Sequence, residues 1–350
     1  MPSFRRGHVG RIIQERAGLQ RVEVHRDADG EGPGGGAGEP AYVLTQLTGP
    51  VAPGDEVLYN DTAVQLGLGT GGWHVVHANL TRGEWGEPGG GHVLKLRYTS
   101  LQADTGVQEE RNPGVSTDLG GMPVVACTLH SQLGVVVAAA RAEKPSVRIA
   151  YVMTDGGALP LALSDLVAEL SARRLLVGTV SAGQAFGGDV EAVGVPSALA
   201  LARHHLDADV VVVAMGPGVV GTESELGTSA LEAAPVLDAA AALGGRPVLC
   251  VRASEVDARP RHRGVSHHAL TVLDLVRSPV DVPVPHSLLG LLDGPAGRHH
   301  VVEVAAADAA TSLDAAGLSV TTMGRGPADD PVFFAAAASA GAHAVALLRS

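Results

Sequence analysis

The chain has 350 residues, a formal net charge of −12 and 45% hydrophobic residues, but only 3% aromatic residues, so its core must be built from Val, Leu and Ala rather than from rings. This length allows a sizeable core and favours two domains. The acidic balance argues against non-specific binding of nucleic acid, which depends on neutralising phosphates with basic side chains.

The N-terminus and the cysteines indicate the compartment. Arg5 and Arg6 are not followed by the apolar segment of a signal peptide, and no run approaches the roughly 18 apolar residues of a membrane span. Cys127 and Cys250 lie in apolar, strand-like runs, which favours buried free thiols over a disulfide or a metal pair. The sequence therefore predicts a cytoplasmic protein without a membrane partner.

Residues 1–103 carry short runs rich in Val, Ile and Leu, separated by Gly and Pro turns. This pattern is typical of a small antiparallel β-barrel-like domain. Residues 27–40 are rich in glycine and predict a flexible hairpin loop. Residues 104–121 are polar and without period, which predicts a linker or crossing arm. Strands are expected at 10–13, 19–24, 41–47, 56–58, 73–76 and 92–101.

Residues 122–350 alternate apolar runs with amphipathic or Ala-rich stretches, including expected helices at 161–174 and 224–243. Continuous apolar strands that alternate with helices predict an α/β domain with a mostly parallel sheet covered on both faces. The expected strands are 123–127, 147–153, 175–180, 210–215, 247–251, 300–304 and 318–322.

Five polar or small loops follow the first five of these strands. In open parallel sheets ligands bind outside the carboxyl ends of the strands, so these loops are expected to share one edge. His130 and Ser131 lie in the first loop and Asp155 in the second. Such loops are polar in any case, so a shared cleft remains a hypothesis.

The loop after residues 210–215 has the GxGxxG spacing, with Gly216, Gly218 and Gly221 between a strand and a predicted helix. Such glycines let a phosphate approach backbone amides at a helix start. The strand is not the first of its series, and no acid follows where a ribose partner is expected, which argues against NAD. Thr222 either belongs to this anion site or is the first residue of a helix capping box with Glu225. The cofactor, if there is one, stays unknown.

Ionisable residues are densest at 254–268. Arg259, Arg261 and Arg263 offer planar guanidinium groups to a phosphate or carboxylate and stay charged. Asp257 would orient these arginines. The alternative is internal, with acids of the loop pairing with the arginines only to hold it in place.

His262, His267 and His268 belong to the same stretch and, with Asp155, are the candidate catalytic residues for proton transfer. Adjacent residues on a helix point about 100° apart, so at most one of His267 and His268 is expected to face the site. No cysteine is near and no HExxH spacing occurs. No metal site is therefore predicted.

Four strings carry a resemblance to a known family: YVMTDGGALP at 151–160, AFGGDVEA at 185–192, RHRGVSHH at 261–268 and TMGR at 322–325. In these strings the chain resembles an uncharacterised bacterial family, domain of unknown function 3866. The resemblance covers most of the chain, including the N-terminal barrel. It implies no activity and no catalytic residue.

The function expected from these features is binding of a small anionic ligand, a phosphorylated one by preference, at the carboxyl edge of the sheet. Whether the protein is an enzyme stays open. One alternative is a non-catalytic interaction or regulatory protein that engages a partner protein. A further alternative is a metal-dependent hydrolase, which needs at least three convergent His or Asp ligands. The Ala-, Val- and Leu-rich helices also leave room for a homodimer.

Overall fold

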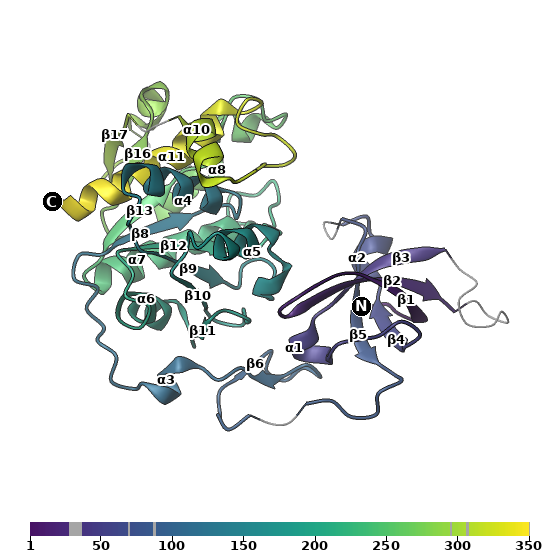
Figure 1. Ribbon diagram of the computed structural model, residues 1–350. Coiled ribbons are helices and arrows are strands. Elements are labelled where there is room, and N and C mark those ends of the chain that lie inside the picture. Colours follow the sequence, from purple (N-terminus) through teal and green to yellow (C-terminus); the bar gives the residue numbers. More distant parts are fainter. Residues whose placement is uncertain (28–36, 69–70, 87–88, 295, 306–307, 350) are drawn as a thin grey trace. The chain divides into compact units, whose positions relative to one another are not determined.

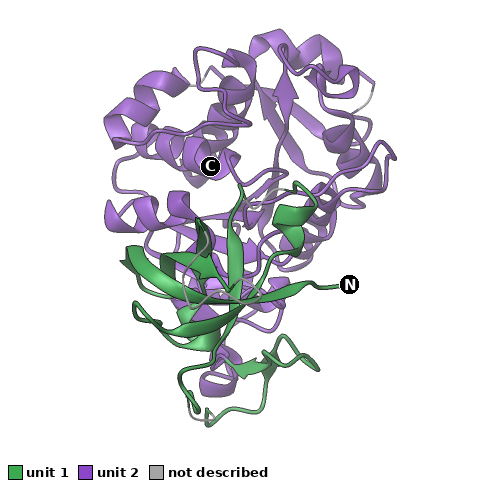
Figure 2. Ribbon diagram, turned by 90° about the vertical axis from the view of Figure 1, so that its right-hand side faces the viewer, with its two compact units in different colours: residues 1–104 green, residues 105–350 purple. Residues whose placement is uncertain are grey.

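The computed structural model describes residues 1–27, 37–68, 71–86, 89–294, 296–305 and 308–349. The chain forms two compact units, Met1–Asp104 and Thr105–Ser350 (Figure 2). Of the Gly-rich loop predicted at 27–40, residues 28–36 lie outside the described residues, and a strand begins at Gly38.

The first unit contains a closed barrel with strand order β1-β2-β3-β5-β4, which confirms the predicted barrel. Its pairs are antiparallel except for the parallel pair β3–β5. In β2, Val22 and Val24 are buried while Arg21, Glu23 and His25, which alternate with them, are partly exposed. This alternation is what a closed sheet with one buried face requires. The elements are β1 (Phe4–Arg16), β2 (Leu19–Arg26), β3 (Gly38–Val43), α1 (Thr45–Thr48), β4 (Glu56–Asn60), α2 (Thr62–Gln65) and β5 (His74–Asn79).

The strand predicted at 92–101 is mostly absent. Only Leu94–Lys95 forms a strand, β6, which pairs with β7 (Ala103–Asp104). Leu96 and Tyr98 have positive φ values of 53° and 61°, and this left-handed backbone cannot continue a strand.

The second unit is built on an eight-stranded sheet with order β11-β10-β9-β12-β8-β13-β16-β17. All its strand pairs are parallel, which confirms the predicted α/β class. In Figure 1 the strand labels follow this order from β11 upward to β17. The strands are β8 (Pro123–Cys127), β9 (Ile149–Thr154), β10 (Gly178–Ser181), β11 (Val190–Glu191), β12 (Val210–Met215), β13 (Arg246–Cys250), β16 (Asp281–Val284) and β17 (His300–Glu303).

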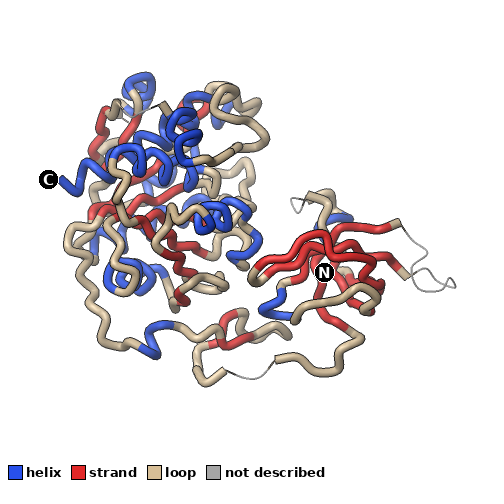
Figure 3. The backbone as a smooth tube through the Cα atoms, in the orientation of Figure 1, coloured by secondary structure: helices blue, strands red, loops and turns tan. Residues whose placement is uncertain are grey.

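Helices cover both faces of this sheet (Figure 3). Val124 and Ala126 of β8 pack into one core with α6, α7 and α8, while Val125 and Cys127 pack into another with α4, α10 and α11. Because alternate residues of a strand point to opposite faces, one apolar strand supplies both cores. The helical segments are α3 (Gln108–Arg111), α4 (Gln132–Glu143), η1 (Leu161–Leu163), α5 (Asp165–Ala172), α6 (Val195–His204), η2 (Ser229–Glu232), α7 (Ala233–Ala242), η3 (Pro260–His262), α8 (His267–Leu275), η4 (His286–Leu288), α9 (Leu289–Leu292), α10 (Ala309–Ala316), α11 (Pro331–Ala346) and η5 (Leu347–Arg349).

The two cysteines sit side by side on neighbouring central strands. Cys127 of β8 pairs in register with Cys250 of β13. Both are buried free thiols, as the apolar runs around them predicted.

In the second unit one strand prediction is wrong and one strand of the sheet was not predicted. Residues 318–322 form no strand. Leu318, Val320 and Thr322 are buried in alternation, but in this segment only Thr322 makes a bridge, with Arg325. The unpredicted strand β16 (Asp281–Val284) contains Pro283, which hides the strand pattern. It is the next-to-last strand of the sheet.

The C-terminal helix α11, together with η5, is long and apolar enough to cross a membrane by length and composition. Of its most apolar window, 72% is buried inside the protein. It packs closely against α4 in the core that also holds Phe333 and Phe334. It therefore has the character of a core helix.

The strand order places a topological switch at the middle of the sheet. β8 leads into α4 on one face, whereas its neighbours β12 and β13 lead into α7 and α8 on the other. Loops that diverge in this way leave a crevice outside the carboxyl ends of the strands. The loop between β13 and α8 starts at this point. A short two-stranded pair, β14 (Ala253–Ser254) and β15 (Gly264–Val265), closes its base.

Candidate functional site

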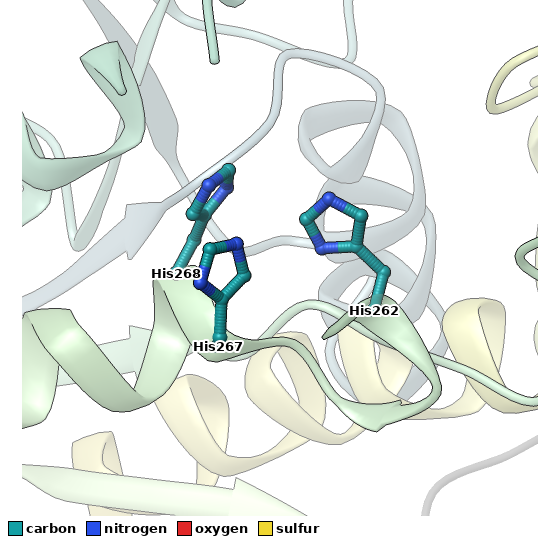
Figure 4. Close-up of side chains that lie close together, drawn as sticks. All are labelled: His262, His267 and His268. Carbon is teal, nitrogen blue, oxygen red and sulfur yellow. The ribbon is translucent and has the colours of Figure 1, made fainter. Parts of the chain in front are cut away.

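Three histidines of the β13–α8 loop come together (Figure 4). Ser266 caps α8 by accepting a hydrogen bond from the backbone N–H of His268, so His267 and His268 are the first two residues of the helix. His262 ends the 3₁₀ turn η3. The ring centroid of His262 lies 5.1 Å from that of His267 and 5.0 Å from that of His268. We call these three residues the histidine triad.

The expectation that at most one of His267 and His268 faces the site is wrong. Their ring centroids are 4.1 Å apart, and one ligand atom from each of the three histidines lies within 4.8 Å of the others. The rule of about 100° per residue describes where the side chains leave the backbone. An imidazole reaches far enough from its Cα to lean back toward its neighbour at an open helix end.

The triad is kept uncharged by its surroundings. Burial, together with the positive charges of Arg252 and Arg259, lowers the pKa of His262 to about 3. Burial and the neighbouring His267 lower the pKa of His268 to about 4. The Nε2 atoms of His267 and His268 are buried without a hydrogen-bond partner. Leaving a buried polar atom unsatisfied costs about 1–3 kcal/mol, so the fold maintains this cluster at a cost.

Beside the triad lies an arginine network centred on a buried acid. Asp257 accepts hydrogen bonds from the Nε and NH2 of Arg259, both at 3.0 Å, and from Arg252 at 3.1 Å. Arg325 lies 4.0 Å from Asp257 and 3.2 Å from Asp330. The hydrogen bond from Arg259 is the main cause that holds the pKa of Asp257 well below its usual range. Three arginines thus share two carboxylates, which leaves positive charge in excess.

Arg261 and Arg263 are held differently. Arg263 donates from its Nε to the backbone carbonyl of Asp257 at 3.0 Å. Arg261 approaches Glu223 at 3.9 Å, an acid whose side chain is 93% exposed, and its own Nε is buried without a hydrogen-bond partner. Of Arg259, Arg261 and Arg263, Arg261 is therefore the one that makes no hydrogen bond to another of the described residues.

The glycine loop does not open a helix. Helical structure begins only at Ser229, and Thr222 lies in an exposed turn where its hydroxyl donates to the carbonyl of Gly227 at 3.0 Å. The capping-box interpretation of Thr222 is therefore wrong, because no helix begins at the next residue. For the same reason the loop lacks the helix N-terminus that the dinucleotide motif requires.

The glycines themselves have local roles. Gly218 has a φ of 97°, and a Cβ on Gly216 would lie 2.3 Å from the carbonyl oxygen of Ala158. Gly216 therefore lets the loops after β9 and β12 pass closely, whereas Gly218 is favoured by its positive φ alone. A Cβ on Gly221 would lie 3.2 Å from Cε1 of His268, which places the glycine loop directly against the histidine triad.

His130 ties strands to a helix, whereas Ser131 makes no such link with its side chain. The Nδ1 of His130 lies 2.9 Å from the carbonyl of Met215, and its Nε2 lies 2.7 Å from the hydroxyl of Ser164. Burial lowers the pKa of His130 to about 4. Ser131 is the N-cap residue of α4 but makes no capping hydrogen bond with its side chain. Both ring nitrogens of His130 are occupied, which fits a structural link between β8, β12 and α5.

Asp155 lies at the tip of β9, where its carboxylate accepts a hydrogen bond from the backbone N–H of Gln184 at 3.0 Å. Near it lies Glu232, which sequence reasoning did not single out. The hydroxyl of Thr154 donates to Glu232. Burial, and to a lesser degree the charge of Asp155, raises the pKa of Glu232 to about 7. No sequence signal marks Glu232, because it looks like an ordinary acid of a helix.

Gln132 is a second residue that the sequence did not reveal. Its Oε1 accepts hydrogen bonds from the backbone N–H groups of Thr128 and Leu129, and its Nε2 donates to the carbonyl of Val251. The side chain is fully buried. It therefore clamps the ends of β8 and β13 together beneath the site.

Two hollows of the surface lie elsewhere. One of about 490 Å³ is lined by residues that include His286, Glu303 and Asp308. Another of about 450 Å³ lies in the first unit and is lined by residues that include Phe4, Leu47 and His77. Neither of these two hollows includes a candidate site residue.

The fold and the site define a class: an N-terminal barrel followed by a parallel α/β unit whose carboxyl edge carries a buried cluster of histidines and arginines. A family model described as "Protein of unknown function (DUF3866)" matches residues 40–341. The chain belongs to this family, as its resemblance predicted. The match begins within β3, so β1 and β2 precede it. No significant match was found among curated proteins or among solved structures.

Proposed function

We propose that this protein is a cytoplasmic protein that binds a small anion, phosphate-bearing by preference, at the loop between β13 and α8. The observation that carries the proposal is Arg261. Its side chain is 29% exposed, its nearest acid is 3.9 Å away and faces solvent, and its Nε is buried without a hydrogen-bond partner. A phosphate or carboxylate would satisfy these donors with charge-assisted hydrogen bonds.

The surroundings support an anion in this place. Arg252, Arg259 and Arg325 share only two carboxylates, so the local charge is positive although the whole chain carries −12. The capped start of α8 adds roughly 0.3–1 kcal/mol for a nearby anion. Gly221 of the glycine loop lies near the same place, since a Cβ added to it would lie 3.2 Å from Cε1 of His268.

The contacts of one arginine support the alternative of a non-catalytic interaction protein. Arg259 donates two hydrogen bonds to Asp257 of its own loop, which is the internal pairing expected of a loop that needs no ligand. A protein that only engages a partner protein would have the whole network closed in this way. Arg261 is the residue at which the two functions differ.

The test is a thermal-shift panel of orthophosphate, nucleotides, sugar phosphates and acyl-CoA on the chelator-treated full chain. A ligand at about 100 times its Kd should add about 2.7 kcal/mol of stability. We expect the shift in the wild type and in the matched control Arg298→Ala, an exposed arginine of the same unit, but not in Arg261→Ala. If no anion stabilises the wild type, or if Arg261→Ala responds equally, the anion proposal fails and partner capture is the next step.

A further inference from the structure

The histidine triad has the composition and spacing of a metal site. One ligand nitrogen from each of His262, His267 and His268 lies within 4.8 Å of the others. Zinc holds imidazole nitrogens at about 2.0–2.1 Å in a tetrahedron, which sets them roughly 3.3 Å apart. Side-chain rotations of these rings can close that difference. We propose that the histidine triad binds one divalent transition-metal ion, Zn²⁺ or an ion of similar preference.

Two buried nitrogens of the triad lack a hydrogen-bond partner among the described residues. His262 is 1% exposed and His268 is 4% exposed, and the Nε2 atoms of His267 and His268 have no hydrogen-bond partner. A neutral imidazole carries one donor and one acceptor nitrogen. A metal ion uses the acceptor nitrogen, so it would satisfy atoms that the chain leaves unpaired.

Other buried histidines of the same unit are satisfied. Both ring nitrogens of His130 have partners, at 2.9 and 2.7 Å. His299 is 8% exposed, and its Nε2 donates to the carbonyl of Leu273 while its Nδ1 accepts from the backbone N–H of Val280. His130 and His299 are thus hydrogen-bonded at both ring nitrogens. The triad departs from that pattern at two of its three rings.

Ser266 holds two members of the triad in place. Its hydroxyl lies 2.8 Å from Nδ1 of His262 and accepts from the backbone N–H of His268 at 3.3 Å. Metal-binding histidines generally hydrogen-bond through the nitrogen that does not face the metal, and this bond fixes the ring. Ser266 therefore leaves Nε2 of His262 as its ligand atom and anchors the start of α8 at the same time.

The ligand set defines which ion and which further ligand fit. Imidazole nitrogens suit Zn²⁺, Cu²⁺, Ni²⁺ and Fe²⁺ rather than Mg²⁺ or Ca²⁺, which prefer oxygen. Three protein ligands leave a fourth position of the tetrahedron open, as in catalytic zinc sites. Three neutral imidazoles do not compensate the charge of the ion, and Arg261 is nearby, so the fourth ligand would be an anion. This last step rests on the anion binding proposed above; the metal site itself does not.

The experiment is metal titration of the chelator-stripped full chain with Zn²⁺ by calorimetry and with Co²⁺ by visible absorption. The variants are His262→Gln, His267→Gln and His268→Gln. Because the chain has 15 histidines, His205→Gln, an exposed residue at the end of α6, is the matched control. We expect one ion per chain with the absorption of a tetrahedral site in the wild type and the control, and a loss of at least about 100-fold in affinity in each triad variant. Ser266→Ala should lose about 10-fold to 100-fold.

The melting temperature of each metal-free variant shows whether it folds, and Zn²⁺ should raise the melting temperature of the wild type and His205→Gln but not of the triad variants. If one triad variant does not fold, the cobalt spectrum of the wild type and the other two decide. Absence of stoichiometric binding, or equal binding by the triad variants and the control, overturns the proposal. Arg261→Ala should keep the metal. Its retention with loss of the anion separates failure of the anion proposal from failure of this one.

Discussion

The two units use ionisable side chains in different ways. In the barrel, ion pairs join neighbouring strands at the surface, as between Arg11 and Glu23, whose side chains are 68% and 25% exposed. In the α/β unit, Arg252 and Asp257 are 8% and 3% exposed. Exposed pairs contribute little to stability, whereas buried charges must be compensated fully or they oppose folding. The buried network is therefore where charge has a structural or functional purpose.

The largest effect should come from removing the shared acid. Asp257→Asn leaves the buried Arg252 and the neighbouring Arg259 without their carboxylate. We expect a loss of about 3–5 kcal/mol in the free energy of unfolding, the range for breaking a buried ion pair. Urea unfolding at neutral pH measures it.

The control for this variant is Glu169→Gln, which breaks an exposed pair with Arg173 on one helix of the same unit. It should lose no more than about 0.5 kcal/mol. Equal losses in the two variants would mean that Asp257 is not more important than a surface acid, and the contrast between the units would disappear.

A second effect concerns the pH dependence of Glu232. Its pKa in the folded protein is raised from 4.5 to about 7 by burial, so the folded state holds a proton that the unfolded state releases. Stability conferred by this proton is present below the unfolded pKa and is lost as the pH rises through the interval to the folded pKa. Relative to Glu232→Gln, the wild type should lose about 3 kcal/mol across that interval.

Urea unfolding of both proteins at several pH values within the interval tests this effect. Asp155→Asn is the matched control, because the charge of Asp155 contributes to the raised pKa. It should reduce the slope without abolishing it. A difference between wild type and Glu232→Gln that stays constant with pH contradicts the burial of an ionisable carboxyl at this position.

The smallest effect is expected in the barrel. Arg11→Ala removes a cross-strand pair with Glu23 whose N–O distance is 3.0 Å, but the arginine is mostly exposed. The free energy of unfolding should fall by less than about 1 kcal/mol and the difference should shrink in high salt. A larger loss that salt does not change would show that the barrel also depends on its charges.

The fold was largely predictable because burial patterns are local. The apolar run of β8 is long enough to feed two cores, and it predicted a parallel strand covered on both faces. The segment 318–322 has the alternating burial of a strand but pairs with no strand, since whether an extended segment finds a neighbour depends on the rest of the chain. The reverse holds for β16, which does pair in the sheet although Pro283 interrupts its apolar pattern and hides it in the sequence.

The sequence predicted which stretch of residues forms the candidate site, but not how its side chains are arranged in space. Polar side chains at 254–268 follow a buried strand, so their location at the carboxyl edge could be expected. The convergence of His267 and His268 could not, because helix geometry alone separates them. Gln132 and Glu232 gave no signal, since their partners are backbone groups or side chains distant in sequence.

The two neighbouring thiols at the ends of β8 and β13 can report how often the sheet opens locally. Cys127 and Cys250 lie in register on the two central strands and are 2% and 0% exposed. A thiol reagent in solution can reach them only when these strands separate. Their rate of alkylation therefore measures how often the sheet opens beneath the triad. Any metal ion or anion that binds there and stabilises the native state should lower this rate.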